Sequence, residues 1–215
     1  MRVLVVNPNA TVEMTERIAA ELRQYLPPDI TLISATNHDG PASIQGAADG
    51  AAALPGTLAL LRAPGHDGAV IACFDDTGLI ELRDIHPRPL TGIGEAAFAE
   101  AAARGRPFAV LTTSPLSVPV LEANITAYGL AQHCRKIHAS SIEVLDFETD
   151  RAGAERRLIA AGRDLLTQYP EVETVVLGCA GMGGLSASVG AALGVTVVDP
   201  IAAAAHSLMA SFALS

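Results

Sequence analysis

The sequence repeats at a constant offset of 106 residues, and this repeat restricts the folds that are open to the chain. Two of its three cysteines, Cys73 and Cys179, are separated by that distance. The same shift superposes Gly78-Leu79 on Gly184-Leu185, Val70-Ile71 on Val176-Leu177, Leu4-Val5 on Val110-Leu111, Asn7 on Thr113 and Ala96-Ala97 on Ala202-Ala203. The repeat predicts two lobes of the same plan, related by an approximate two-fold axis. The alternative is that any two α/β units of similar length align roughly.

Short apolar runs rich in β-branched residues alternate with helix-length segments along the chain. We expect strands at 3–6, 30–34, 69–73, 90–92, 108–112, 142–145, 174–177 and 195–198. We expect helices at 11–26, 45–62 with a break near Pro55-Gly56, 78–85, 94–104, 118–128, 152–168, 185–193 and 200–211. Continuous apolar strands that alternate with helices are typical of parallel sheets covered on both faces. The predicted fold class is therefore α/β, with two similar parallel-sheet lobes.

The predicted lobes divide the chain near its middle. We expect lobe one to comprise residues 1–92 with the C-terminal helix 203–215, and lobe two to comprise residues 93–202. No linker rich in serine or proline separates the two halves, so the lobes should pack closely. Ligands of open α/β sheets bind outside the carboxyl ends of the strands, which places the expected active site in the cleft between the lobes.

The composition favours a small-molecule enzyme over a nucleic-acid-binding protein. The formal net charge is -9 and Lys136 is the only lysine, so the basic surface that neutralises phosphates is lacking. No apolar run reaches the roughly 18 residues of a membrane span, and the first apolar run is too short for a signal peptide. Three widely spaced cysteines make no disulfide framework. We therefore expect a cytoplasmic protein with reduced thiols and no membrane partner.

Both repeated cysteines lie in one kind of motif. The stretches 70–79 and 175–185 each contain a buried strand that ends at a cysteine, followed by a glycine-containing turn and a helix. A helix N-terminus stabilises a thiolate and is expected to lower the thiol pKa. Backbone N–H groups in such a turn can hold an oxyanion. Cys73 and Cys179 are therefore the candidate catalytic residues.

A two-fold axis between the lobes would place these two thiols on opposite faces of one bound ligand. Racemisation requires this arrangement, because a base removes the α-proton from one face and an acid returns a proton to the other. The alternative is that each cysteine is a small buried hydrophobic residue. Cys134 has no counterpart under the offset and is interpreted as incidental.

Polar loops follow other predicted strands on the same side, at Asn7-Pro8-Asn9, at 112–115 and at 40–44. These residues could bind substrate, or they could serve only as turn and cap residues. His206 is interpreted as a satisfied core histidine. The histidines lack HExxH spacing, and the chain has no CxxC, GxGxxG or Walker motif. No metal and no cofactor are therefore expected.

At these motifs the sequence resembles the hydantoin racemase branch of the aspartate/glutamate racemase superfamily. The shared motifs are Asn7-Pro8-Asn9, Met14-Thr15, 40–44, 72–75, Gly78-Leu79, 92–97, Thr112-Thr113, 177–182 and Asp199-Pro200. The resemblance implies a two-lobed, cofactor-independent racemase that forms a homo-oligomer and acts on 5-monosubstituted hydantoins or allantoin. It implies oxyanion- and ring-binding roles for Asn7, Ser43, Ile44, Phe74, Thr112, Thr113, Ala180 and Gly181.

The residues that follow each cysteine differ from those of related enzymes. Glutamate and aspartate racemases usually have Asn-Thr after the first cysteine and Thr-His after the second, where this chain has Phe74-Asp75 and Ala180-Gly181. Fewer groups remain to bind a substrate carboxylate, and Asp75 and Asp76 would repel an anion if they faced the site. Arylmalonate decarboxylases, which are similar in fold, have glycine in place of one cysteine.

A neutral cyclic imide is therefore the favoured substrate, with two-base proton transfer at C5 of a hydantoin. The alternatives are an allantoin racemase, an amino-acid racemase of the aspartate/glutamate type, and a non-catalytic protein that binds a small molecule.

Overall fold

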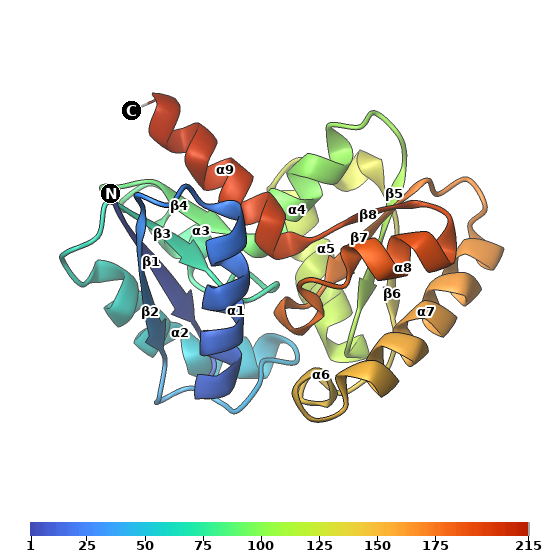
Figure 1. Cartoon of the computed structure of the whole chain (residues 1–215), viewed down its shortest axis with the longest axis horizontal. Helices are drawn as coiled ribbons and strands as arrows, with labels where there is room; N and C mark the ends of the chain where they lie inside the picture. The colour runs from blue at the N-terminus through green and yellow to red at the C-terminus, as the bar shows by residue number, and fades with distance from the viewer. Residues whose placement is uncertain (215) are drawn as a thin grey trace.

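The computed structural model describes residues 1–214 and contains two four-stranded parallel sheets, one in each lobe (Figure 1). The first sheet has the strand order β2-β1-β3-β4, from β1 (Arg2–Asn7), β2 (Thr31–Thr36), β3 (Gly68–Ile71) and β4 (Leu90–Gly92). The second has the order β6-β5-β7-β8, from β5 (Phe108–Thr112), β6 (Cys134–Ala139), β7 (Thr174–Gly178) and β8 (Thr196–Val198).

The two sheets have the same topology, and three of the four equivalent strand pairs begin 106 residues apart. β1 and β5, β3 and β7, and β4 and β8 are related in this way, whereas β2 and β6 begin 103 residues apart. The registers differ by one residue under the offset of 106, because Val5 pairs with Val70 in the first sheet, whereas Leu111 pairs with Leu177 instead of Val176 in the second. The α/β fold with two similar parallel-sheet lobes is confirmed.

Helices connect the parallel strands. They are α1 (Val12–Tyr25), α2 (Ala47–Arg62), α3 (Leu79–Leu82), α4 (Ile93–Ala102), α5 (Val118–Ala127), α6 (Asp146–Thr149), α7 (Arg151–Gln168), α8 (Ser186–Leu193) and α9 (Pro200–Leu214). Short 3-10 helices lie at η1 (Pro115–Ser117), η2 (Ala131–His133) and η3 (Ala180–Met182). Within residues 1–214, none of these helices is both long enough and apolar enough to span a bilayer.

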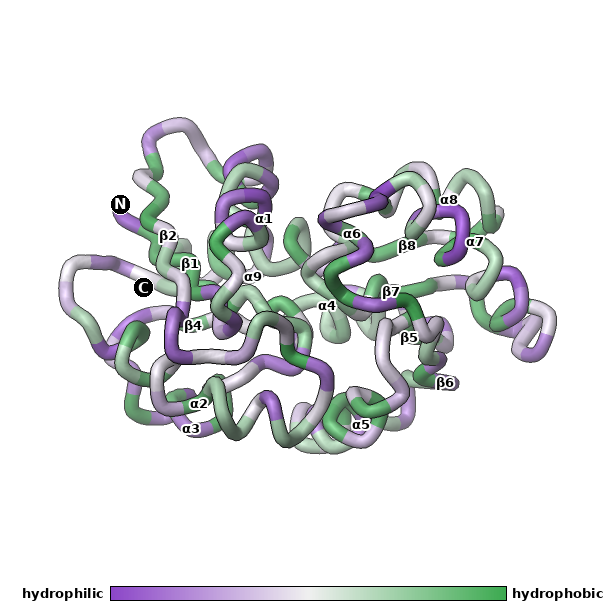
Figure 2. The backbone as a smooth tube through the Cα atoms, turned by 90° about the horizontal axis from the view of Figure 1, so that it is seen from below, coloured by the Kyte–Doolittle hydropathy of each residue, from purple (hydrophilic) through white to green (hydrophobic). Residues whose placement is uncertain are grey.

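Hydrophobic patterning explains why these segments form their elements. Every residue of β3, β5 and β7 is buried, as expected for central strands covered by helices on both faces. In α1 the buried residues Met14, Ile18 and Leu22 recur every four positions, which gives the helix one apolar face. Figure 2 shows the resulting change between hydrophilic and hydrophobic colour along α1.

Two helices lie in the middle of the molecule, between the sheets. Figure 1 shows α4 and α9 side by side there, and α9 also packs against α1 and β4. The buried face of α9 consists mainly of small residues, Ala203, Ala204 and Ala205, which allow close approach of its neighbours. The expected division into 1–92 with 203–215, and 93–202, stays a prediction.

Two details of the predicted secondary structure are wrong. Residues 142–145 form no strand; the edge strand lies earlier, at Cys134–Ala139, where exposed Arg135 and Lys136 hide the strand pattern. Ile142 and Val144 are buried in a loop and alternate with exposed neighbours, which imitates a strand. The expected break at Pro55 is also absent, because α2 runs through it. The Ala51 carbonyl, which Pro55 cannot bond, lies on an exposed turn.

Candidate active site

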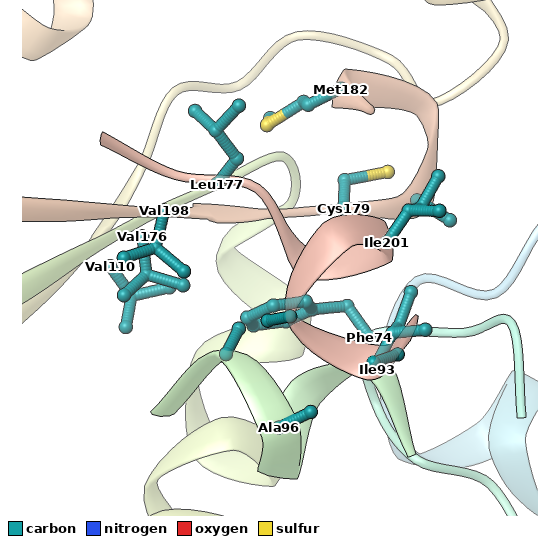
Figure 3. Packing of buried hydrophobic residues seen from close by; sticks show 14 of the residues in the cluster. Phe74, Ile93, Ala96, Val110, Val176, Leu177, Cys179, Met182, Val198 and Ile201 are labelled. Carbon is teal, nitrogen blue, oxygen red and sulfur yellow. The ribbon is translucent and has the colours of Figure 1, made fainter. Parts of the chain in front are cut away.

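Cys73 and Cys179 lie beyond the carboxyl ends of equivalent strands. β3 ends at Ile71, two residues before Cys73, and β7 ends at Gly178, immediately before Cys179. Both thiols are free, with Cys73 half-buried and Cys179 buried. Figure 3 shows Cys179 in the apolar cluster that also contains Phe74, the residue after Cys73.

The two cysteines line one small pocket between the lobes. Lobe one contributes Asn9, Met14, Ile44, Ala72, Cys73, Phe74 and Asp75, and lobe two contributes Thr113, Ser117, Val144, Gly178, Cys179 and Ala180. The strand ends of the repeat thus face each other across a mostly apolar site that carries a few polar groups.

Four of the eight predicted binding residues line this pocket, namely Ile44, Phe74, Thr113 and Ala180. The other four do not. Asn7 is fully buried and donates hydrogen bonds to the Asn9 and Thr15 side chains at 2.8 and 2.9 Å. Thr112 donates to the Gly178 carbonyl oxygen at 2.9 Å. Ser43 accepts from the Gln45 side chain at 3.2 Å, and Gly181 bonds Cys179 through its backbone. The binding role of all eight stays a prediction.

The sequence interpretation did not single out seven lining residues as binding residues, namely Asn9, Met14, Ala72, Asp75, Ser117, Val144 and Gly178. The sequence could have indicated Asn9 as a binding residue, because it belongs to the Asn7-Pro8-Asn9 motif. The Asn9 side chain accepts a hydrogen bond from the Asn7 side chain and donates one to the Met14 sulfur. Val144 had no usable signal, because it was assigned to a strand that does not form.

The backbone turns after the two cysteines share two features. The Gly181 N–H donates to the Cys179 sulfur at 3.4 Å, and the Asp75 N–H opposes the rise in the pKa of the Cys73 thiol. Five residues after each cysteine, Gly78 and Gly184 have φ angles of 90° and 76°. Glycine adopts this left-handed conformation without strain, so the chain can turn at the same point of each repeat into the segment that follows.

The expected lowering of the thiol pKa values is wrong. Burial, and next the Asp75 carboxylate, raise the pKa of the Cys73 thiol well above its usual range. Burial raises the pKa of the Cys179 thiol to about 11, against the opposing effects of the Gly181 N–H and the Arg17 guanidinium. Neither cysteine touches a long helix, since α3 begins six residues after Cys73 and η3 is a single turn. Desolvation therefore dominates.

The two aspartates after Cys73 have different environments. Asp75 lines the pocket, and burial raises its pKa to about 7. Asp76 turns away from the pocket, and its carboxylate accepts from the Gly94 and Glu95 N–H groups at the start of α4 and from the Tyr128 hydroxyl. Only Asp75 can therefore repel an anion in the site directly.

Charged side chains hold the turn after Cys179 and connect the lobes. Arg17 of α1 forms an ion pair with Glu148 of α6 at 2.7 Å and approaches the Ala180 carbonyl oxygen at 3.5 Å. Arg151 donates to the carbonyl oxygens of Gly181 and Gly183, and Asp199 accepts from the Gly184 N–H at 2.7 Å. The position of the Cys179 turn thus depends on both lobes.

Two other side chains lie away from this site. His206 is exposed on α9 and lies 3.5 Å from Glu100, so its interpretation as a core histidine is wrong. The helix turns it outward between the buried residues Ala205 and Leu208. Cys134 begins the edge strand β6 and is not among the residues that line the pocket.

These features define a two-lobed α/β protein with a site built around two facing thiols. Residues 3–208 match the family model described as Asp/Glu/Hydantoin racemase. The chain is 42% identical over 208 residues to a hydantoin racemase of Rhizobium meliloti, covering 95% of this chain and 86% of the relative. The chain therefore belongs to the Asp/Glu/Hydantoin racemase family.

Solved structures of two allantoin racemases are also similar. The protein from Pseudomonas fluorescens superposes with a TM-score of 0.93 and is 30% identical, covering 100% of this chain and 92% of its own. The protein from Klebsiella pneumoniae superposes with a TM-score of 0.90 and is 33% identical, covering 100% of this chain and 88% of its own.

Proposed function

We propose that this racemase-family member interconverts the enantiomers of 5-monosubstituted hydantoins by proton transfer between Cys73 and Cys179. The observation that carries the proposal is that both thiols, at equivalent points of the repeat, line one small pocket between the lobes. The hydantoin racemase of Rhizobium meliloti supports the choice of substrate class.

In the proposed reaction, one cysteine begins as thiolate and the other as thiol. The thiolate takes the proton from C5, the electron pair delocalises into the adjacent ring carbonyl, and the opposite thiol donates its proton to the other face of C5. The second cysteine is then the thiolate, ready for the reverse direction. Because burial raises both thiol pKa values, the thiolate is scarce at neutral pH but strongly basic once formed.

The pocket favours a neutral ring over an amino acid. Its only charged lining residue, among residues 1–214, is Asp75, which would repel an α-carboxylate. A hydantoin needs no carboxylate partner, because its own ring carbonyl acidifies the C5–H.

Allantoin is the second candidate substrate, favoured by the two allantoin racemase structures. Allantoin is itself a hydantoin with a ureido group at C5, so both substrates use the same reacting carbon. A panel of enantiopure hydantoins and allantoin, followed by polarimetry, separates the two. We also propose a cytoplasmic homo-oligomer, which light scattering and fractionation test.

The decisive experiment follows the loss of optical rotation of an enantiopure 5-benzylhydantoin in buffer with a reducing agent, after subtraction of the uncatalysed rate. We expect Cys73→Ser and Cys179→Ser each to lower the racemisation rate by about 10²- to 10⁴-fold or more, since each removes one proton-transfer group. Cys134→Ser, the matched control, should keep the wild-type rate.

Deuterium exchange at C5 in heavy water tests the two thiols separately. Each single variant should exchange the proton of only one enantiomer and should not invert it. Full racemisation by either variant would refute the mechanism. If no hydantoin, allantoin or amino acid is racemised by the wild type, the result favours the alternative of a non-catalytic binding protein.

A further inference from the structure

Asp75 is a charged side chain in the pocket that breaks the repeat, and it is the only charged residue among the described residues that line the pocket. Its equivalent in lobe two is Gly181, which has no side chain. Both residues offer their N–H to the sulfur of the preceding cysteine, but only Asp75 adds a carboxyl group beside it. The paired cysteines Cys73 and Cys179 are sufficient for the proposed proton transfer. The Asp75 carboxyl group therefore requires a separate explanation.

The Asp75 carboxyl group is held in place but incompletely satisfied. Its backbone carbonyl accepts from the Asn124 side chain at 2.9 Å, and its carboxylate faces the Gly46 N–H. The second carboxyl oxygen, Oδ2, is buried and has no hydrogen-bond partner within residues 1–214. A buried acceptor without a donor is costly, so a ligand that supplies an N–H would relieve this cost.

The location of Asp75 indicates which ligand atom it meets. Asp75 lines the same pocket as Cys73 and Cys179 and lies two residues after Cys73. Its carboxyl group is therefore placed to meet an atom next to the reacting carbon, which must sit between the two sulfurs. In a hydantoin, C5 has two ring neighbours, the N1–H donor and the C4 carbonyl. A carboxylate attracts the first and repels the second, on which negative charge develops.

We propose that the Asp75 carboxylate accepts a hydrogen bond from the substrate N–H adjacent to the reacting carbon, which makes Asp75 a specificity-determining residue for cyclic ureides. The proposal rests on the proposed racemisation of hydantoins and adds a contact that fixes the ring orientation. With N1 toward Asp75, C4 and its oxygen point to the other side of the pocket. A substrate with a carboxylate or no N–H at this position is disfavoured.

The test compares enantiopure 5-benzylhydantoin with its N1-methyl and N3-methyl derivatives. The two derivatives have the same size, so their difference reports which N–H the site uses. For the wild type, we expect kcat/KM for the N1-methyl compound to be about 10- to 100-fold lower than for the parent, since a hydrogen bond to a charged group is lost. The N3-methyl compound should be much less affected.

Asp75→Asn keeps the shape of the side chain but places an N–H₂ group where an acceptor is needed. We expect it to lower kcat/KM for the parent, and to reduce the discrimination between the parent and the N1-methyl compound to about threefold or less. A purely structural role would lower both rates together and leave their ratio unchanged. Asp49→Asn is the charge-matched control. The charge of Asp49 contributes to the raised pKa of the Asp75 carboxyl group, but Asp49 does not line the pocket. It should preserve the ratio.

Equal rejection of the N1-methyl and N3-methyl compounds by the wild type overturns the proposal, even if Asp75→Asn fails to fold. An unchanged parent/N1-methyl ratio in a folded Asp75→Asn variant also overturns it, while the proposed function stands if the wild type racemises the parent. A wild type that racemises no hydantoin overturns both.

Discussion

Asp76 connects the turn after Cys73 to the rest of the molecule, and Asp76→Ala tests that connection. The carboxylate accepts from the Gly94 N–H at 2.9 Å, the Glu95 N–H at 2.7 Å and the Tyr128 hydroxyl at 2.9 Å. The two N–H groups belong to the first turn of α4, where no helical carbonyl is available to them. Tyr128 lies at the C-terminal end of α5, in the other lobe.

Removal of the carboxylate leaves three donors without an acceptor. Two of these contacts are only partly buried, so we assign about 1 kcal/mol to each donor and expect a loss of about 3 kcal/mol in the free energy of unfolding. For a chain of this length, that corresponds to a fall of about 6–12 °C in Tm.

The loss of stability in Asp76→Ala should also depend on pH, and the pKa of Asp76 determines whether it grows or falls as the pH rises. Burial raises this pKa from 3.8 to about 7, so the folded state binds more protons than the unfolded state between these values. The contribution of Asp76 to stability is therefore complete below the unfolded pKa and decreases as the pH rises through about 7. We expect the loss in Asp76→Ala to be smaller by about 1 kcal/mol at roughly pH 8.5 than at roughly pH 6.

Urea unfolding followed by far-UV circular dichroism, with linear extrapolation, measures the difference at both pH values. Asp84→Ala is a suitable control, because Asp84 is an exposed carboxylate nearby and should cost less than about 0.5 kcal/mol. A loss below about 1 kcal/mol near pH 6, or a loss that grows as the pH rises, would refute this account.

Two further predictions concern the turns and the thiols. Gly184→Ala should destabilise the protein by about 0.5–1 kcal/mol more than Gly194→Ala in urea unfolding. Both glycines have similar positive φ angles, but only the new Cβ at 184 meets a neighbour, the Glu21 carboxylate at 2.8 Å, which must shift. Equal losses would contradict this. The racemisation kcat/KM should rise by up to about tenfold per pH unit between roughly pH 8 and 10, because the pKa of Cys179 is about 11 and the thiolate is the reactive form. A rate that is flat over that range would contradict the raised thiol pKa.

The sequence was informative about the fold where strands are buried on both faces. Central strands such as β5 and β7 consist of continuous apolar residues and were placed within about a residue of their observed bounds. The edge strand β6 was missed because one of its sides faces solvent, and its sequence therefore includes Arg135 and Lys136. The direction of the thiol pKa shift was also missed, since it depends on burial, which the local motif does not encode.

The prediction of the lining residues shows a similar limit. The motifs indicate which loops reach the cleft, but not which side chain of a loop points into it. In the Asn7-Pro8-Asn9 loop, the Asn7 side chain forms hydrogen bonds within the protein, whereas Asn9 lines the pocket. In the Thr112-Thr113 pair, Thr112 bonds β7 and Thr113 faces the pocket. Alternation along an extended segment separates Thr112 from Thr113, and the register of that alternation is set by tertiary packing. Asn7 and Asn9 are two residues apart and are separated by the bend that follows β1 at Pro8.

Residues that follow the repeat and residues that break it contribute different properties to the proposed site. Proton transfer on both faces of one carbon requires two groups on opposite sides, and in the proposed mechanism the duplicated strand ends supply them as Cys73 and Cys179. The plane of the substrate ring is not symmetric, since an N–H lies on one side of C5 and a carbonyl on the other. A pocket that was symmetric throughout would accept the ring in two opposite orientations. The replacement of one member of an equivalent pair, as with Asp75 and Gly181, removes that ambiguity and leaves the paired thiols intact.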